Sequence, residues 1–136
     1  MVLYREIKGE RKMTEVSPKI VGLTESSVDD GREVYNFLLL NDEIVEKSYK
    51  SIRDRLIFTN KRVIVIDLQG LTNKKREYMS IPYSKISSFS CESGGDFDID
   101  AELKIWASGF GKAWFQFSRD TDIRTLAKLI STYVCK

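Results

Sequence analysis

Histidine is absent from this 136-residue sequence, and cysteine and proline occur only twice each. Serine triads, cysteine–histidine dyads and the usual histidine metal sites all need an imidazole, so these arrangements are excluded. Cys91 and Cys135 are too few and too far apart for a disulfide framework or a four-ligand zinc site. We expect both cysteines to act as small apolar residues, and we expect no metal and no cofactor.

Long apolar runs are missing as well. The longest are Phe37 to Leu40 and Val63 to Ile66, whereas a membrane-spanning helix needs roughly 20 apolar residues. The first twelve residues contain neither the apolar segment nor the cleavage site of a signal peptide, and Val2 excludes N-myristoylation. These features predict a cytoplasmic protein without a transmembrane segment. Met13 is an alternative natural start.

The composition is that of an ordinary folded domain, with 42% hydrophobic and 31% charged residues. Residues 1–26 have mixed charge, Pro18 and no sustained period, so we predict a partly flexible N-terminal extension with one helical turn at most. From Ser27, a cap-like serine followed by Asp30 and apolar residues at helical spacing predicts a short helix over about 28–40. Residues 27–136 are then expected to form a single domain.

After residue 42 the pattern changes to short β-branched and aromatic segments separated by turn residues, which is typical of an all-β sandwich or barrel. Seven strands are predicted, at about 43–52, 54–59, 62–68, 75–82, 85–92, 99–108 and 112–118. In the third strand, Val63 to Ile66 are apolar on both faces. We therefore expect its outer side to be covered, either by the N-terminal helix or by another chain.

Period-2 alternation is clearest in the sixth predicted strand. Its small and apolar residues fall on one face and its polar residues and tryptophan on the other. The inward set is Ala101, Leu103, Ile105 and Ala107, and the outward set is Glu102, Lys104 and Trp106.

The last segment has helical spacing. Ile123, Leu126 and Ile130 belong to an apolar stripe at i, i+3 and i+7, after a candidate cap at Asp120 or Thr121. Burying such a stripe stabilises the fold by roughly 1.5 to 3 kcal/mol for each large side chain. We therefore predict an amphipathic helix over about 121–135 that docks on the open end of the β-structure.

The order and spacing of several short segments between Leu38 and Val134 resemble the bacterial pleckstrin-homology (PH) domain family. These segments are Arg53-Asp54, Phe58 to Arg62, Ser80 to Tyr83, Phe97 to Trp106 and Thr121 to Ile123. The resemblance implies a seven-stranded antiparallel barrel or sandwich capped by the C-terminal helix. It also implies a non-enzymatic binding or scaffold domain of undefined role, without catalytic residues, whose members tend to form rings through neighbouring β-surfaces. The first 26 residues depart from the family pattern.

Lys50, Arg53 and Arg55 resemble the Lys-x-x-Arg-x-Arg spacing by which some eukaryotic PH domains hold inositol phosphates in the first hairpin. Arginine offers a bidentate fork and lysine a point charge to an anionic headgroup or a phosphorylated partner. Asp54 interrupts the motif, and most bacteria lack phosphoinositides. The alternative is a solvated, ion-paired turn.

Charge is segregated along the chain. Residues 47–85 contain ten Lys or Arg against three Asp or Glu, whereas residues 92–102 contain five acids and no base. A basic edge of one subunit could therefore meet an acidic edge of the next, which is a heterologous contact that can close a ring. The alternative is pairing of neighbouring strands within one chain. The candidate interface residues are Lys61, Arg62, Lys74, Lys75, Arg76, Asp96, Asp98, Asp100, Glu102 and Trp106.

The acidic residues of this segment also suggest metal binding or hydrolysis. Asp96, Asp98 and Asp100 begin like a calcium loop, but Ala101 and Ala107 stand where that loop needs glycine and glutamate. Weak divalent binding and a carboxylate-based hydrolase at Asp98 and Asp100 remain as alternatives.

The aromatic residues could stack bases or wedge into a membrane, but we expect them to pack in the core or at an interface. They are Trp106, Phe110, Trp114, Phe115 and Phe117. We expect the protein to bind itself, with another protein or a peripheral anionic surface as further partners. No nucleic acid is expected, because the net charge is only +2.

Overall fold

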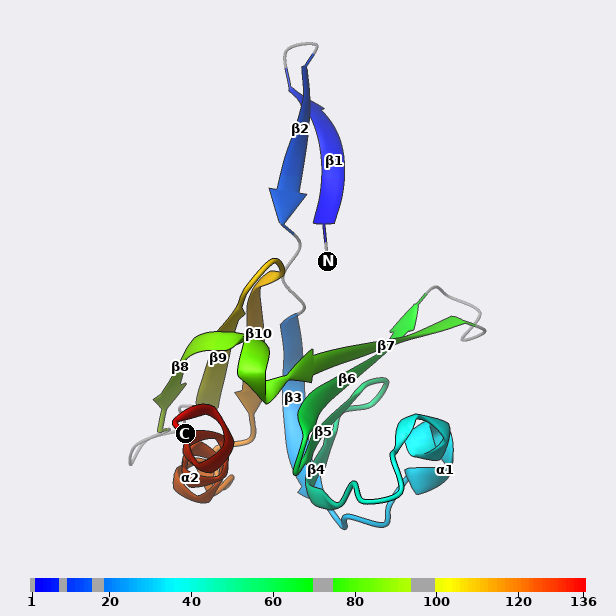
Figure 1. Ribbon diagram of the computed structural model, residues 1–136, viewed down its shortest axis with the longest axis vertical. Helices are drawn as coiled ribbons and strands as arrows, with labels where there is room; N and C mark the ends of the chain where they lie inside the picture. Colours follow the sequence, from blue (N-terminus) through cyan, green and yellow to red (C-terminus); the bar gives the residue numbers. More distant parts are fainter. Residues whose placement is uncertain (1, 8–9, 16–18, 70–74, 94–99) are drawn as a thin grey trace.

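Eight strands form one sheet in the computed structural model, which describes residues 2–7, 10–15, 19–69, 75–93 and 100–136. Two further strands, β1 (Val2–Ile7) and β2 (Glu10–Glu15), pair only with each other among the described strands (Figure 1). The strands of the large sheet are β3 (Lys19–Ser26), β4 (Val45–Lys50), β5 (Arg55–Thr59), β6 (Arg62–Gln69), β7 (Lys75–Pro82), β8 (Ile86–Glu92), β9 (Ala101–Ala107) and β10 (Gly111–Phe117). The helical elements are α1 (Arg32–Tyr35), η1 (Asn36–Leu38), η2 (Tyr83–Lys85) and α2 (Ile123–Val134).

The sheet order is β7-β6-β5-β4-β3-β10-β9-β8. All seven predicted strands are present, and their pairings with one another are antiparallel. The sheet bends at β3, so that β4 to β7 and β8 to β10 enclose one core (Figure 1). Phe58 and Val65 from the first half and Ile105 and Phe115 from the second are buried in that core. This confirms the mainly β fold with a C-terminal helix.

Helix α2 packs its apolar stripe on this core. Ile123, Leu126 and Ile130 are buried and belong to the same cluster as the inward residues of the sheet. The capping residue is Asp122, whose side chain accepts a hydrogen bond from the Thr125 N–H (3.1 Å). The prediction of Asp120 or Thr121 as the cap was wrong, because Ser118 instead donates its hydroxyl hydrogen to Asp120 (2.6 Å) before the helix begins.

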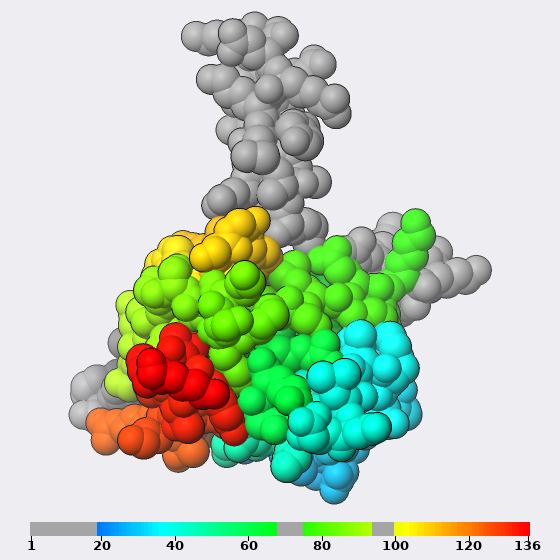
Figure 2. All heavy atoms as spheres, in the orientation of Figure 1, coloured from blue at the N-terminus to red at the C-terminus, as the bar shows by residue number. Residues whose placement is uncertain are grey.

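A second, smaller core lies on the outer side of the β5–β6 pair. Ile57, Ile64 and Ile66 are buried there against Tyr35 of α1, with Leu38 of η1 packed at its margin. Of the two covers proposed for the apolar third strand, the N-terminal helical segment of the same chain is therefore the one observed. Figure 2 shows this segment in cyan, on the opposite side of the displayed face from the red end of α2.

The predicted helix over 28–40 is shorter than expected. Ser27 accepts a hydrogen bond from the Asp29 N–H (3.2 Å), so it closes a turn instead of capping a helix. Gly31 then has a φ of 69°, a left-handed conformation that prevents the helix from starting earlier than Arg32. After Tyr35 the chain tightens into the 3-10 turn η1.

Residues 1–26 were predicted to form an extension outside the domain, and this prediction was wrong for the last eight of them. Lys19–Ser26 form β3, which lies between β4 and β10 and pairs in parallel with β10. Its buried residues, Ile20 and Leu23, are three apart because Gly22 between them has a φ of 73°. That break removes the period-2 alternation by which strands are predicted.

Within the described ranges, none of the helices is long and apolar enough to cross a membrane.

Candidate functional site

The β4–β5 hairpin carries the predicted ligand residues. Its turn is closed by a hydrogen bond from the Ser51 N–H to the Asp54 carbonyl oxygen (2.9 Å), and the Ser51 hydroxyl oxygen accepts from the Asp54 N–H (3.0 Å). This geometry places Ile52 at the tip, where it is fully exposed (102%). Lys50 and Arg55 are direct partners across the hairpin, so the two cations point to one side.

Asp30 lies between these two cations. One of its oxygens, Oδ2, is 3.1 Å from Lys50 Nζ and 3.2 Å from Arg55 Nη1. The hydrogen bonds from Lys50 and Arg55 lower the pKa of Asp30. The structure thus places Lys50 and Arg55 side by side, and both charges converge on a carboxylate of the same chain.

Arg53, the third predicted residue, lies among both cations and carboxylates. A hollow of about 170 Å³ is lined by Arg53 together with residues that include Ser51, Asp54, Arg55, Ile66 and Arg76. Burial, followed by the nearby Asp54 and Glu77 carboxylates, raises the pKa of Asp67, while Arg53 acts in the opposite direction. Cations and carboxylates therefore mix at this hollow.

The predicted interface cations divide into two groups. Lys75 and Arg76 are exposed at the start of β7, which is an outer strand of the sheet. Lys61 instead forms an ion pair with Asp42 (3.1 Å), and Arg62 forms one with Glu43 (2.8 Å). Lys74 lies outside the described residues.

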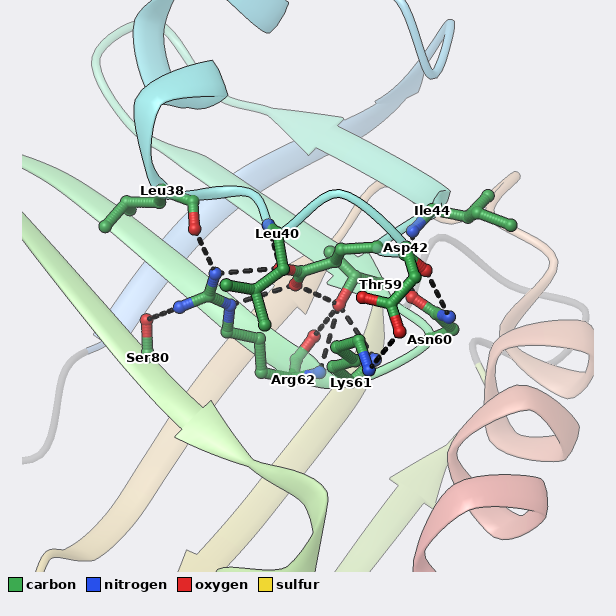
Figure 3. A network of polar contacts seen from close by, with 10 residues as sticks. Leu38, Leu40, Asp42, Ile44, Thr59, Asn60, Lys61, Arg62 and Ser80 are labelled. Atoms are coloured by element: carbon green, nitrogen blue, oxygen red, sulfur yellow. Dashed lines mark hydrogen bonds and ion pairs between the residues drawn. The ribbon is translucent and has the colours of Figure 1, made fainter.

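Arg62 belongs to a buried polar network, shown in Figure 3. The Glu43 side chain has no exposed surface, and it accepts hydrogen bonds from Arg62 Nε (2.9 Å), Arg62 Nη2 (2.8 Å), the Thr59 hydroxyl (2.7 Å) and the Leu40 N–H (3.1 Å). Arg62 also donates to the Leu38 carbonyl oxygen and to the Ser80 hydroxyl. These hydrogen bonds link the segment before β4 to the β5–β6 turn. The Arg62 guanidinium therefore binds groups of its own protomer.

The predicted acidic residues are only partly described. Asp96 and Asp98 lie outside the described residues, and with them the proposed carboxylate pair. Asp100 is exposed and accepts a hydrogen bond from Gln116 Nε2 (3.1 Å). Among the described residues, no three His, Cys, Asp or Glu side chains gather as a metal site would require.

The outer face of β9 carries the remaining candidates. Glu102 and Trp106 are both half-buried and alternate with the buried residues Ala101, Leu103 and Ile105, as predicted. Lys104 lies between them, and its ammonium group is 5.3 Å from the centre of the Trp114 ring on β10. Alternation along the sequence predicted which residues of β9 point outward. Which residues of β10 they contact depends on the register between the two strands, which the sequence does not show.

A second hollow, of about 400 Å³, lies where α2 meets the β5–β6 turn. It is lined by Lys61, Tyr83 and Tyr133, and the two tyrosine rings stack with centroids 4.9 Å apart. Burial raises the pKa of Tyr83, whose hydroxyl donates to the Thr59 carbonyl oxygen (2.7 Å). These rings therefore act in packing.

Comparison with known sequences identifies the family of this chain. Residues 16–134 match the family described as Bacterial PH domain. The uncharacterised protein YjqA of Bacillus subtilis (strain 168) is 47% identical over 100 residues, which cover 72% of this chain and 79% of YjqA. The uncharacterised protein YozO of the same organism is 32% identical over 99 residues, which cover 72% of this chain and 84% of YozO.

Solved structures agree with the family match. A crystal structure of a DUF1696-family protein with a pleckstrin-homology domain from Shewanella loihica PV-4 has a TM-score of 0.73 and 36% identity, and the match covers 84% of this chain and 98% of that one. A pleckstrin homology domain from Shewanella amazonensis SB2B has a TM-score of 0.63 and 39% identity, with 80% and 89% covered. The chain therefore belongs to the bacterial PH domain family, a generally non-enzymatic family whose similar curated members are uncharacterised.

Proposed function

We propose that this protein is a non-enzymatic binding or scaffold domain that assembles with copies of itself, the outer strand β7 of one protomer pairing with β8 of the next. The open sheet is the observation that carries this proposal. Its order leaves β7 and β8 at the two ends, and no other described strand pairs with the outer side of either. Unpaired edges of this kind are ready to accept a strand from another chain.

Charge and register favour one direction of pairing. Lys75 and Arg76 are exposed at the start of β7, and Glu92 is exposed at the end of β8. Antiparallel pairing of the eight-residue β7 with the seven-residue β8 brings these opposite charges together. Parallel pairing would instead place the cations beside Ile86 and Ser87, where no opposite charge is available.

Such a contact is heterologous, because two different edges meet. Each edge hydrogen bond contributes only about 1 kcal/mol net, whereas association costs at least about 4 kcal/mol in lost freedom. A single contact is therefore weak, and closure into a ring, which engages both edges of every protomer, stabilises the assembly. We expect the oligomer to depend on protein concentration and on salt.

The test uses size-exclusion chromatography with light scattering at physiological salt. One variant carries Lys75→Glu and Arg76→Glu, a second carries Glu92→Lys, and the control is Lys128→Glu on the exposed side of α2. Each edge variant alone places like charges opposite each other, so we expect monomers from both and an oligomer from the control. Mixing the two edge variants restores opposite charges at both kinds of contact and should restore the oligomer.

A monomeric wild-type protein of 15.7 kDa at high micromolar concentration would refute self-assembly. If the wild type assembles and the two edge variants do so equally well, the β7–β8 contact is the wrong interface.

A second candidate function, binding of an anionic headgroup or phosphorylated partner, is favoured by one observation. Lys50 and Arg55 converge on a single oxygen of Asp30, so the hairpin holds an anionic oxygen in the folded chain. An external anion has to displace that carboxylate. In liposome flotation with and without anionic lipid, Asp30→Asn should increase binding and Arg53→Glu with Arg55→Glu should abolish it. Binding unchanged by both variants would exclude this site.

A further inference from the structure

Both tryptophans of the protein and three of its lysines lie together on the outer face of β3, β10 and β9. β10 is the middle strand of these three (Figure 1). Trp114 on β10 is the direct partner of Lys104 on β9 and of Lys19 on β3. In the next row of the sheet, Lys112 on β10 is the partner of Trp106 on β9. Tryptophan and lysine therefore alternate both along and across these two strands, and we call these five residues the Lys–Trp face.

The three lysines converge on one ring. Their ammonium nitrogens lie 4.1 Å (Lys19), 5.3 Å (Lys104) and 5.4 Å (Lys112) from the centre of the Trp114 indole. An ammonium group within about 6 Å of an indole is attracted to the face of the ring. The same crowding brings three positive charges together, and these repel one another.

The three lysines form no ion pair with a described carboxylate. The Trp114 indole N–H is buried and has no acceptor among the described residues. An ammonium group has no lone pair, so the three lysines cannot accept this hydrogen bond. A ligand that carries anionic oxygens would neutralise the lysine charges and could also accept the hydrogen bond from the indole N–H. Lysine side chains are flexible enough to move with such a ligand.

Acidic residues are set apart at one side of this face. Glu102 lies on the same face of β9, two residues from Lys104, and Asp100 is held by Gln116 of β10. A polyanion is therefore favoured across the two lysine rows and disfavoured across the acidic row. The low net charge of the whole chain, from which no nucleic acid was expected, conceals this local separation.

We propose that the Lys–Trp face binds single-stranded nucleic acid, with its lysines on the phosphates and its tryptophans stacked on bases. Proteins that bind single strands without strong sequence preference combine these two elements on a sheet surface. Stacking needs unpaired bases, so a duplex can use only the lysines. An acidic peptide would likewise satisfy the lysines but would leave both indoles unused.

The chain supplies its own reporter, because Trp106 and Trp114 are its only tryptophans and both belong to the proposed site. We would titrate the full chain with a single-stranded dT octamer at 50 mM salt and record tryptophan emission. Quenching is expected in the wild type and in both single variants, Trp106→Phe and Trp114→Phe, because each retains one reporter. A duplex of the same length and poly-glutamate serve as comparison ligands, and both should bind at least tenfold more weakly.

Salt dependence counts the phosphate contacts. For single strands the slope of log K against log salt is about −0.7 per contact, so three lysines predict a slope of roughly −2. Each of Lys19→Ala, Lys104→Ala and Lys112→Ala should reduce that slope by about 0.7, and the control Lys128→Ala should not. Trp114→Ala should weaken binding about tenfold through lost stacking. If this variant does not fold by circular dichroism, the three lysine variants carry the test alone.

Absence of quenching and of any oligonucleotide binding at 50 mM salt would overturn the proposal. Equal affinity for poly-glutamate would overturn it too, since the face would then be a general polyanion or acidic-protein site. A slope unchanged by all three lysine variants would place the nucleic acid elsewhere on the molecule.

Discussion

Replacing Arg62 by alanine would leave the Glu43 carboxylate buried without its charge partner. The Glu43 side chain has no exposed surface, and of the three described residues that donate to it only Arg62 is charged. Breaking a buried ion pair by removing one member typically costs about 3 to 5 kcal/mol. Because the Arg62 side chain retains 18% exposure, we expect the lower end, about 3 kcal/mol. That is a large part of the total stability of a small domain, about 5 to 15 kcal/mol.

The assay is equilibrium unfolding in urea, followed by far-ultraviolet circular dichroism. With a slope of about 2 kcal/mol per molar urea, the midpoint of Arg62→Ala should fall by roughly 1.5 M. The double variant Glu43→Leu with Arg62→Met removes both charges, and it should recover part of the loss because no uncompensated charge stays buried. A loss below about 1 kcal/mol in Arg62→Ala, or a double variant no more stable than Arg62→Ala, would refute the reasoning.

The same network makes a prediction about pH. Burial alone would raise the pKa of Glu43, but the hydrogen bonds from Arg62, Thr59 and Leu40 outweigh it and hold that pKa below its usual value. A carboxyl group with a lowered pKa in the folded state stabilises the fold above its unfolded pKa, about 4.3, and loses this contribution as the pH falls. The difference in stability between wild type and Arg62→Ala should therefore be full at pH 7 and shrink below pH 4. A difference that stays constant down to pH 3 would contradict this account.

Three other substitutions test separate parts of the fold. Leu126→Ala should cost about 2 to 5 kcal/mol in urea unfolding, because it opens a cavity between α2 and the sheet, and Lys128→Ala on the exposed side should cost almost nothing. Gly22→Ala should cost about 1 kcal/mol from the positive φ alone, since no described atom lies within 4 Å of the added carbon; an unchanged midpoint would refute that strain. Asp122→Ala should lower the melting temperature at pH 7 and much less at pH 3, because the hydrogen bonds from Thr125 lower the pKa of Asp122; an equal loss at both pH values would rule out the charged cap.

The sequence predicted the strands wherever side chains alternate strictly. Leu103 and Ile105 alternate with Glu102 and Lys104, and the corresponding strand was placed to within two residues. β3 was missed because Gly22 changes the direction of the chain between its two buried residues. A strand whose buried positions are three residues apart lacks the alternation from which strands are predicted. The helix predicted over 28–40 was too long, because Gly31 delays its start to Arg32 and the chain tightens into η1 after Tyr35.

The candidate sites were harder to predict, because their decisive partners are distant in sequence. The Lys50–Arg55 pair follows from the hairpin, but Asp30, which lies between them, is 20 residues before Lys50. Arg62 is one of ten cations in a basic segment, and the sequence does not show that it alone reaches a buried glutamate. Such pairings are set by tertiary structure. Counting charges along the sequence predicts a basic surface, but it does not show which of the cations form ion pairs within the same chain.

The two proposed surfaces are separate, and their combination leads to a further expectation. Assembly would use the edges β7 and β8, whereas the Lys–Trp face lies on β3, β10 and β9, so each added protomer contributes one more such face. Linked weak sites gain avidity for a ligand long enough to span them, commonly by 10² or more. A dT polymer of 60 nucleotides should therefore bind the assembled wild type far more tightly than the octamer does. It should lose that advantage in the Lys75→Glu with Arg76→Glu variant, whose substitutions lie on β7, at the other end of the sheet from β9. If the length dependence were the same in the assembled and monomeric proteins, the two surfaces would act independently.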